Sequence, residues 1–243
     1  GRVLAPSPET AHLRDLEGFD VPRDVVRRWD FSRDGILRSV EDSLRRTGLD
    51  RFDILYLHDP DDHFAQASGE GIGALIELRE QGVVAAVGAG MNAAGPLAEL
   101  IRRAYVDVVM CAGRHTLLDD SAATDLLPLA LERGVGVVAA GVFNSGLLSR
   151  PRPPADATYD YRPAPPALLA RAHAIADVSE RHGVTLPDVA VAFALRHPAV
   201  VSVVLGARGH RQVTQNLERA LIPIPDDLWR DLAENDLIPK EDA

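Results

Sequence analysis

The stretch Leu55 to His63, LYLHDPDDH, ends an apolar run on a histidine and then places three aspartates and a second histidine within five residues. Imidazole and carboxylate groups in close sequence can bind a metal ion or transfer a proton. Pro60 fixes a turn here, and no distant cysteine or histidine spacing completes a metal shell. We therefore predict no metal site, and expect solvated loop residues that cap the next helix at Asp59, Asp61, Asp62 and His63.

His58 itself stands at the end of one of five apolar runs, which cover residues 52–57, 83–87, 106–110, 135–139 and 201–205. Runs without polar alternation are typical of strands buried on both faces of a parallel sheet. Helical patterns separate them, from Ser32 to Gly48, over about 64–81 and 93–104, and from Asp119 or Asp120 to about Gly134, with Pro128 expected to kink the last.

Strands that alternate with helices in this way predict right-handed parallel crossovers, in a doubly wound sheet or a (β/α) barrel. No G-x-G-x-x-G motif follows any of the predicted strands, which weakens the doubly wound dinucleotide-binding fold. Within the α/β class we therefore predict a barrel. Residues 149–166 contain six prolines and predict a stiff, irregular loop. We treat residues 1–243 as a single domain.

Composition limits the partners. The chain has 243 residues, 46% of them hydrophobic, and a formal net charge of -10, which argues against a nucleic-acid surface. No apolar run is long enough to cross a bilayer, and the opening residues carry no signal-peptide pattern. Cys111 is the only cysteine, so we expect a buried free thiol and a cytoplasmic protein. The oligomeric state is not predicted.

The residues that follow the predicted strands are small, polar or cationic. They are His58 and residues 89–92, 111–115, 141–144 and 206–208. In a (β/α) barrel the carboxyl ends of all strands meet at the mouth that holds the active site. The sequence therefore predicts one rim that binds a polar ligand through backbone amides and a few side chains.

These strand ends resemble those of the aldo-keto reductases. The segments that carry the resemblance are DILYLH at 53–58, GAGMN at 88–92, GVFNSGLL at 141–148 and VLGAR at 204–208, continuing to Asn216-Leu217. Within the superfamily, HDPDDH, AGRHTLLD and GVFNSGLLSRP look most like the branch that oxidises aldoses at C1. The resemblance implies a (β/α)8 barrel and hydride transfer between a small sugar or related aldehyde and a nicotinamide cofactor.

The resemblance also implies roles for individual residues. His58 matches the histidine that holds the reacting oxygen, and Asn92 matches the residue that holds the nicotinamide carboxamide. His115 stands where the family pattern has a stacking aromatic. A helix beginning near His210 would favour a phosphate at its N-terminus. The residues expected along the phosphates, ribose and adenine are Gly141, Phe143, Asn144, Gly206, Ala207, Arg208, Gln212, Gln215 and Asn216.

Three choices stay open at this point. Arg208 would pair with a 2′-phosphate, which favours NADP(H), with NAD(H) as the alternative. Asn144 is as readily a turn residue as a ligand. Trp29 is a candidate for the substrate pocket, although aromatic residues beside a helix start more often serve packing.

The family's other catalytic residues, an Asp, a Tyr and a Lys, belong to strands that would precede Gly1. Five strands are also too few to close such a barrel, so we expect further strands before Gly1 in the functional polypeptide. The alternatives are a catalytically inactive NADP-binding homologue that acts as a sensor or regulatory subunit, and a metal-dependent hydrolase that uses His58, Asp59 and His63.

Overall fold

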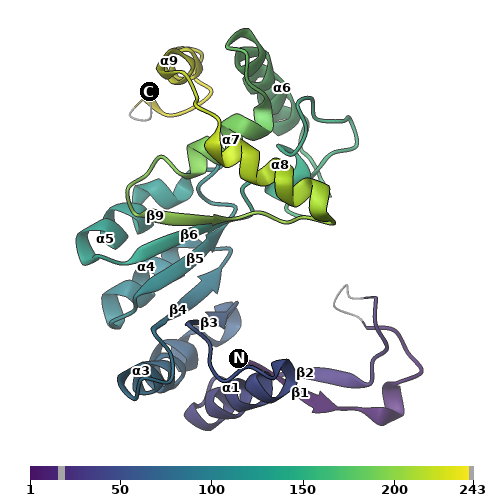
Figure 1. The fold of residues 1–243 in the computed structure, drawn as a ribbon, viewed down its shortest axis with the longest axis vertical. Coiled ribbons are helices and arrows are strands. Elements are labelled where there is room, and N and C mark those ends of the chain that lie inside the picture. The colour runs from purple at the N-terminus through teal and green to yellow at the C-terminus, as the bar shows by residue number, and fades with distance from the viewer. Residues whose placement is uncertain (16–19, 241–243) are drawn as a thin grey trace. The chain divides into compact units, whose positions relative to one another are not determined.

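The computed structural model describes residues 1–15 and 20–240. They form two compact units: Gly1–Met91 with Glu99–Val108, and Asn92–Ala98 with Val109–Ala243. Five strands form one sheet in the order β3-β4-β5-β6-β9 (Figure 1). The alternation of strands and helices that the sequence predicts is confirmed. The prediction of one domain over residues 1–243 stays a prediction.

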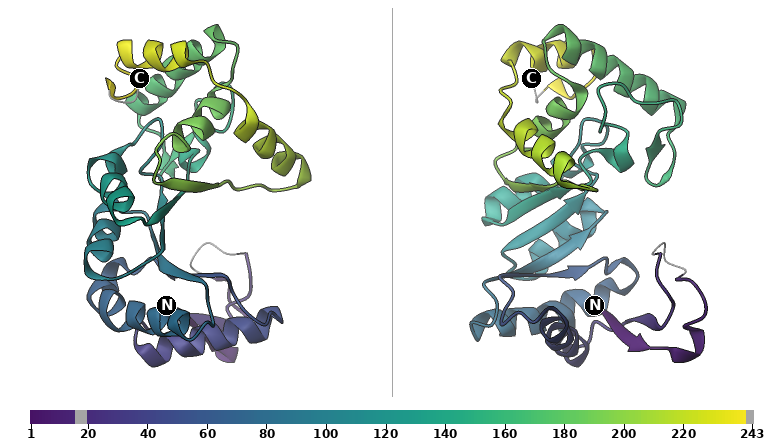
Figure 2. Two further views of the ribbon diagram at one scale, coloured as in Figure 1. Left: turned by 60° about the vertical axis from the view of Figure 1, so that its left-hand side comes forward. Right: turned by 45° about the vertical axis from the view of Figure 1, so that its right-hand side comes forward.

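The first unit opens with an antiparallel ribbon that was not predicted from the sequence. Strand β1 (Arg2–Pro6) pairs with β2 (Val25–Trp29), with Arg2 opposite Trp29 and Pro6 opposite Val25. The two strands lie side by side at the purple end of the chain (Figure 2). The sequence of β1, RVLAP, is bounded by an arginine and a proline, and that of β2, VVRRW, contains two arginines, so neither offers the continuous apolar run by which the other strands were found.

Helix α1 (Arg33–Thr47) has the ends that its sequence predicts. The Ser32 hydroxyl accepts a hydrogen bond from the Gly35 N–H at 3.1 Å, which satisfies one of the free amides of the first turn. Gly48 ends the helix in the left-handed region at φ 70°, and its N–H donates to the Leu44 carbonyl. The Ser32 hydroxyl also donates to the Asp30 carboxylate at 2.5 Å.

Strand β3 (Ile54–His58) pairs in parallel with β4 (Ala86–Met91), with His58 opposite Gly90. The segment predicted as one helix over 64–81 is α2 (Phe64–Gln66), a π-helical turn η3 (Ala67–Gly71) and α3 (Ile72–Glu80). Two glycines in the π-helical turn weaken the regular helix there. A 3-10 turn, η2 (Asp61–His63), precedes α2. A further 3-10 turn, η1 (Pro8–Thr10), follows β1.

The second unit contains β6 (Gly136–Ala140) and β9 (Val200–Val204), which pair in parallel, and most of β5 (Val108–Ala112). Helix α4 (Ala94–Arg103) follows β4. The helix predicted from Asp119 or Asp120 is a 3-10 turn, η4 (Ser121–Thr124), and then α5 (Leu126–Arg133), with Asp125 non-helical between them. Pro128 therefore lies in the first turn, where no N–H is needed, and the predicted kink is wrong.

The rest of the second unit is mainly helical. It contains η5 (Asn144–Gly146), the short strands β7 (Thr158–Tyr159) and β8 (Arg162–Pro163), α6 (Pro166–Arg181), α7 (Leu186–Ala194), α8 (His210–Leu221) and α9 (Asp226–Glu234). Residues from α6, α7 and α9 share one apolar core with Leu147 and Leu148, centred on Ile175, Phe193 and Leu228. No helix in the described part of the chain is long and apolar enough to cross a membrane.

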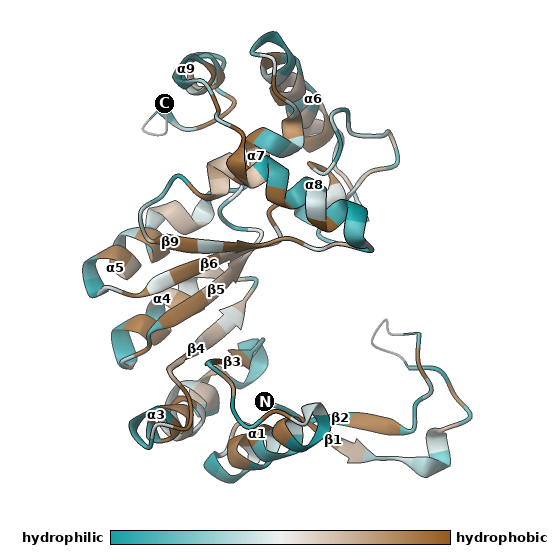
Figure 3. Cartoon of the chain, in the orientation of Figure 1, coloured by the Kyte–Doolittle hydropathy of each residue, from teal (hydrophilic) through white to brown (hydrophobic). Residues whose placement is uncertain are grey.

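Burial of the strands is confirmed at the centre of the sheet and wrong at its margins. Val87, Val109 and Val137 are fully buried, and β5 and β6 are apolar along their length (Figure 3). Val201 in β9 is 64% exposed and Ile54 in β3 is 47% exposed. In the described residues these two strands are the edges of the sheet, where fewer neighbouring side chains cover each face.

The cap of α1 provides a stability test. Ser32→Ala should lower the free energy of unfolding by about 1 kcal/mol, because the Gly35 N–H loses its acceptor. Ser32→Thr keeps an acceptor and should cost much less. Urea unfolding of the three proteins measures the difference. Equal destabilisation by the two substitutions would show that the hydroxyl is not the source of the effect.

Candidate functional site

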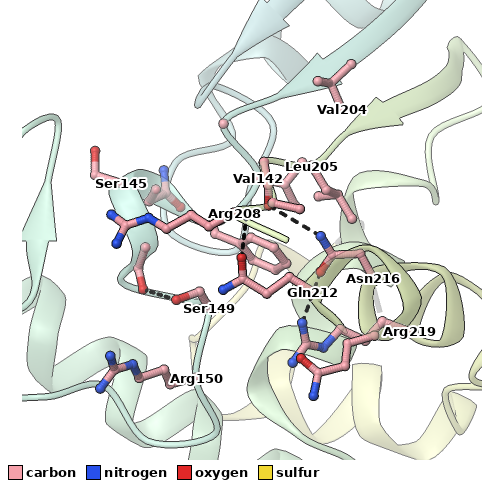
Figure 4. A pocket seen from close by; sticks show the side chains of 17 residues that line it. Val142, Ser145, Ser149, Arg150, Val204, Leu205, Arg208, Gln212, Asn216 and Arg219 are labelled. Atoms are coloured by element: carbon pink, nitrogen blue, oxygen red, sulfur yellow. Dashed lines mark hydrogen bonds between the residues drawn. The ribbon is translucent and has the colours of Figure 1, made fainter. Parts of the chain in front are cut away.

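A cavity of about 580 Å³ lies within the second unit, beside the ends of β6 and β9 (Figure 4). The loop after β6 forms one wall, and the end of β9 with the first turns of α8 forms the other. Nine of the residues predicted to bind cofactor line it: Gly141, Phe143, Asn144, Gly206, Ala207, Arg208, Gln212, Gln215 and Asn216. The structure thus brings together residues that lie up to 75 positions apart in the sequence (216 minus 141).

The cavity is rich in positive charge. Arg150, Arg208 and Arg219 line it, and Figure 4 shows the Arg208 side chain extended across the cavity. Among the described residues, Arg150 and Arg208 have no carboxylate partner, so their charge is available to a ligand. The N-terminus of α8 adds partial positive charge, and its N-cap residue, Gly209, has no side chain with which to satisfy the first amides. This arrangement is suited to phosphate groups.

Asn216 is held in place by a chain of polar contacts. Its amide nitrogen donates to the Gly206 carbonyl at 3.4 Å, and its amide oxygen accepts from Arg219 at 3.1 Å. Arg219 lies 3.5 Å from the carboxylate of Asp188, which is buried and caps α7 together with Thr185. The wall of the cavity formed by α8 is therefore fixed to the N-terminus of α7.

The opposite wall is a strained turn. Gly141, Asn144 and Ser145 have φ values of 62°, 44° and 57°, which lie in the left-handed region. The Asn144 N–H donates to the Gly141 carbonyl at 2.8 Å and closes the turn. A Cβ atom on Gly141 would lie 3.0 Å from the backbone nitrogen of Gly113, so the position requires glycine on two counts.

The Asn144 side chain has unused hydrogen-bonding capacity. The residue is 2% exposed, yet neither the oxygen nor the nitrogen of its amide has a partner among the described residues. A buried amide without partners costs free energy, and such groups in native proteins usually serve a ligand or ordered water. Asn144 is therefore a turn residue that lines the cavity, and its buried amide retains unused hydrogen-bonding capacity.

His115 is not among the residues that line this cavity. Its ring is buried, its Nδ1 lies 2.5 Å from the Asp120 carboxylate, and it packs against Phe193 with ring centroids 5.2 Å apart. His197 meets it edge-on at 6.2 Å, and burial followed by repulsion from His115 lowers the pKa of His197. The pairing with Asp120 holds the His115 ring in the core, and its stacking on nicotinamide stays a prediction.

Asn92 is also absent from the cavity lining and is exposed at the end of β4. Its backbone carbonyl accepts a hydrogen bond from the Arg114 Nε at 2.8 Å. Asn92 was predicted as an individual site residue, whereas Arg114 was predicted only as part of the rim at residues 111–115. The interaction joins residues 22 positions apart, which no local pattern reveals.

His58 belongs to the first unit and ends β3 as predicted. Its side chain is 66% exposed, and its Nδ1 lies 3.2 Å from the carboxylate of Asp59. Asp59 is held at φ 43° while its N–H donates to the Gly90 carbonyl at 2.9 Å. Asp59 is thus fixed to the neighbouring strand and can orient the imidazole of His58.

Trp29 lies in an aromatic cluster of the same unit. Its ring stacks on Phe31 at 5.8 Å and contacts His63 at 5.7 Å, while the Arg2 guanidinium lies 4.5 Å from its centre. His63, predicted to be a solvated loop residue, therefore packs against aromatic rings. The arrangement gives Trp29 a packing role, and its place in a substrate pocket stays a prediction.

The remaining reactive groups have simple environments. Within residues 1–15 and 20–240, no three His, Cys, Asp or Glu side chains gather as a metal site would require. Cys111 is buried as expected, and burial raises the pKa of its thiol to about 12. The thiol therefore stays protonated at neutral pH and is a poor nucleophile.

Comparison with known proteins gives consistent results. The sequence profile of the aldo/keto reductase family matches residues 22–236. D-threo-aldose 1-dehydrogenase from Pseudomonas sp is 44% identical over 242 residues, which cover 98% of this chain and 74% of that protein. Pyridoxal 4-dehydrogenase from Microbacterium luteolum is 36% identical, and the match covers 98% of this chain and 72% of that protein.

Solved structures share the architecture. The holo form of an aldo-keto reductase from Bacillus halodurans superposes with a TM-score of 0.68 at 26% identity, covering 85% of this chain and 68% of its own. A glycerol dehydrogenase from Gluconobacter oxydans superposes with a TM-score of 0.71 at 23% identity, and the match covers 89% of this chain and 69% of that protein's chain. The α/β architecture is thus that of the (β/α)8 barrel, as the strand ends predict.

The strained turn of the cavity can be tested by comparing two glycines. Gly141→Ala should lower the free energy of unfolding by more than about 1 kcal/mol, because it adds a backbone clash with Gly113 to a left-handed conformation. Gly134 has a similar φ of 67° but open space where a Cβ atom would lie, so Gly134→Ala isolates the conformational cost. Thermal and urea unfolding should rank Gly141→Ala as the more damaging. The reverse order would contradict the close approach to Gly113.

Proposed function

Because this chain belongs to the aldo/keto reductase family, a family of oxidoreductases, we propose that it transfers hydride between C1 of an aldose, or a related aldehyde or alcohol, and NAD(P). The observation that carries this proposal is the cavity of the second unit, lined by nine residues predicted for the cofactor. The aldose is suggested by D-threo-aldose 1-dehydrogenase, since its identity to this chain exceeds that of pyridoxal 4-dehydrogenase.

The residues present fit a dinucleotide. Two arginines that lack carboxylate partners in the described part of the chain, together with a helix N-terminus, can balance the charge of a pyrophosphate. The unpaired amide of Asn144 can both donate to and accept from a ribose or phosphate group. Gln215 and Asn216 would meet the adenine end, where the contacts of Asn216 with Gly206 and Arg219 hold its amide in place.

When bound, a nicotinamide accepts or supplies the hydride. His58 would hold the reacting oxygen of the substrate by a hydrogen bond, with its imidazole oriented by Asp59. Such a bond contributes most where charge develops on that oxygen in the transition state. In this proposal His58 acts on the rate and contributes little to cofactor affinity.

The function is tested by two measurements on the full-length polypeptide. Quenching of tryptophan fluorescence by NADPH and NADH measures cofactor binding, and the absorbance of reduced nicotinamide follows oxidation of D-threo aldoses and of pyridoxal. Faster turnover of an aldose supports the proposal. Cofactor binding without turnover of any aldehyde, alcohol or sugar would instead favour a sensor or regulatory subunit.

The cofactor preference depends on Arg208. If the Arg208 guanidinium pairs with a 2′-phosphate, Arg208→Ala should weaken the binding of NADPH by about tenfold or more. The binding of NADH should weaken much less, since only NADPH carries the extra charge. Arg211→Ala, in the first turn of α8 three residues after Arg208 but outside the cavity lining, is the matched control and should leave both affinities close to wild type. Equal weakening of NADPH and NADH by Arg208→Ala would exclude the 2′-phosphate role.

The role of His58 is read from rate and affinity together. His58→Ala should reduce aldose turnover by about 10²-fold or more while cofactor affinity stays near wild type. His58→Asn keeps a polar head and should give an intermediate rate. His63→Ala removes a ring that packs on Trp29, so it should lower stability more than turnover. Loss of activity in His63→Ala together with stoichiometric bound metal would overturn hydride transfer in favour of a metal site.

A further inference from the structure

Arg114 joins several loops at the strand ends of the second unit. Its Nε donates to the Asn92 carbonyl at 2.8 Å, one terminal nitrogen donates to Asp119 at 2.8 Å, and the other lies 3.2 Å from Asp160. The side chain is 23% exposed. One guanidinium therefore joins three segments of chain that follow β4, follow β5 and connect β7 to β8.

The contact with Asn92 is a contact with the backbone. Asn92 lies between the end of β4 and the start of α4, outside both elements. A hydrogen bond from a charged donor fixes the plane of the peptide that follows Asn92, and this restricts the direction of the Asn92 side chain. Arg114 can therefore control the Asn92 side chain through the backbone.

The contact with Asp160 reaches the hairpin of β7 and β8. Asp160 and Tyr161 form its tight turn, with φ values of 47° and 62°. The same hairpin is bonded to the wall of the cavity, because Thr158 Oγ1 donates to the Ser145 carbonyl at 3.0 Å and the Tyr161 N–H donates to Ser145 Oγ at 3.1 Å. The hairpin thus has one attachment at the cavity and another at Arg114.

Asp119 keeps the guanidinium in position. Burial acts to raise the pKa of Asp119, but hydrogen bonds from Ser121 and from Arg114 outweigh it, so the carboxylate stays charged in neutral solution. Arg114 therefore faces two carboxylates and the carbonyls of Asn92 and Gly113, with each of its nitrogens used. A lysine offers a single ammonium group and cannot reproduce this planar arrangement.

We propose that Arg114 is a positioning residue that connects the β7–β8 hairpin to Asn92, so that the hairpin influences how tightly the dinucleotide is held. The inference rests on the proposed function, because Asn92 is assigned to the nicotinamide carboxamide by family resemblance. Its structural basis is independent of that assignment, since the three contacts of Arg114 lie within one unit.

The test is a double-mutant cycle. Asp160→Ala should weaken the binding of NADPH or NADH about two- to fivefold in the wild-type background, as expected for the loss of a partly exposed ion pair. Arg114→Ala should weaken it by about tenfold or more, and adding Asp160→Ala should then have no further effect. Arg114→Lys should not restore affinity, because it keeps the charge but loses the donor to Asn92.

Arg152 supplies the matched control. It lies in the proline-rich segment 149–166, which also contains the β7–β8 hairpin, and its guanidinium pairs with Asp177 and Glu180 of α6. Arg152→Ala should leave dinucleotide affinity unchanged. Hydrogen exchange of the segment 90–95 gives a readout that needs no ligand, and it should be faster in Arg114→Ala and Asp160→Ala but not in Arg152→Ala.

The outcomes separate the two proposals. If the wild-type protein binds no dinucleotide, the proposed function fails, and exchange at 90–95 still shows whether the hairpin is linked to Asn92. If the protein binds a dinucleotide and Asp160→Ala weakens that binding by the same factor in the wild-type and Arg114→Ala backgrounds, only the positioning role fails. Unchanged exchange at 90–95 in Arg114→Ala would overturn it as well. Thermal unfolding of each variant shows whether it is folded at the assay temperature.

Discussion

The backbone of the loop after β6 approaches the end of β5 at Gly141, with space there for a hydrogen atom and for no larger group. The left-handed residues Asn144 and Ser145 follow within four positions, and the hydrogen bond from the Asn144 N–H to the Gly141 carbonyl closes the turn. The turn places Asn144 in the lining of the cavity and presents Ser145 to the β7–β8 hairpin. One wall of the cavity and the attachment of the hairpin both depend on a missing side chain.

Much of the architecture could be predicted from local sequence. Apolar runs without alternation located all five strands of the sheet, and Ser32 and Gly48 marked both ends of α1, because these signals act within a few residues. The ribbon of β1 and β2 was missed because arginines and a proline interrupt its apolar residues. The predicted helix is interrupted at Asp125, three residues before Pro128, whose ring and missing N–H are tolerated only in the first turn of a helix.

The candidate site likewise contains residues that could be predicted from the sequence and contacts that could not. The residues of the cavity were named from the resemblance at two strand ends, and the structure places nine of them around one cavity. The contacts of Arg114 could not be predicted, because its partners Asn92 and Asp160 lie 22 and 46 positions away and are brought together only by the fold. His115 was judged by its place in a motif, whereas its carboxylate partner Asp120 and the neighbouring Phe193 fix its ring in the core.

The buried thiol of Cys111 has a further use. With its pKa raised to about 12 and almost no exposed surface, this side chain reacts with alkylating reagents only when the end of β5 separates from its neighbours. Because the chain has no other cysteine, the rate of its modification reports a single local event. That event is the local opening of the strand end that precedes Gly113 and Arg114. The rate at which Cys111 is alkylated therefore measures how often the sheet opens beside the cavity wall.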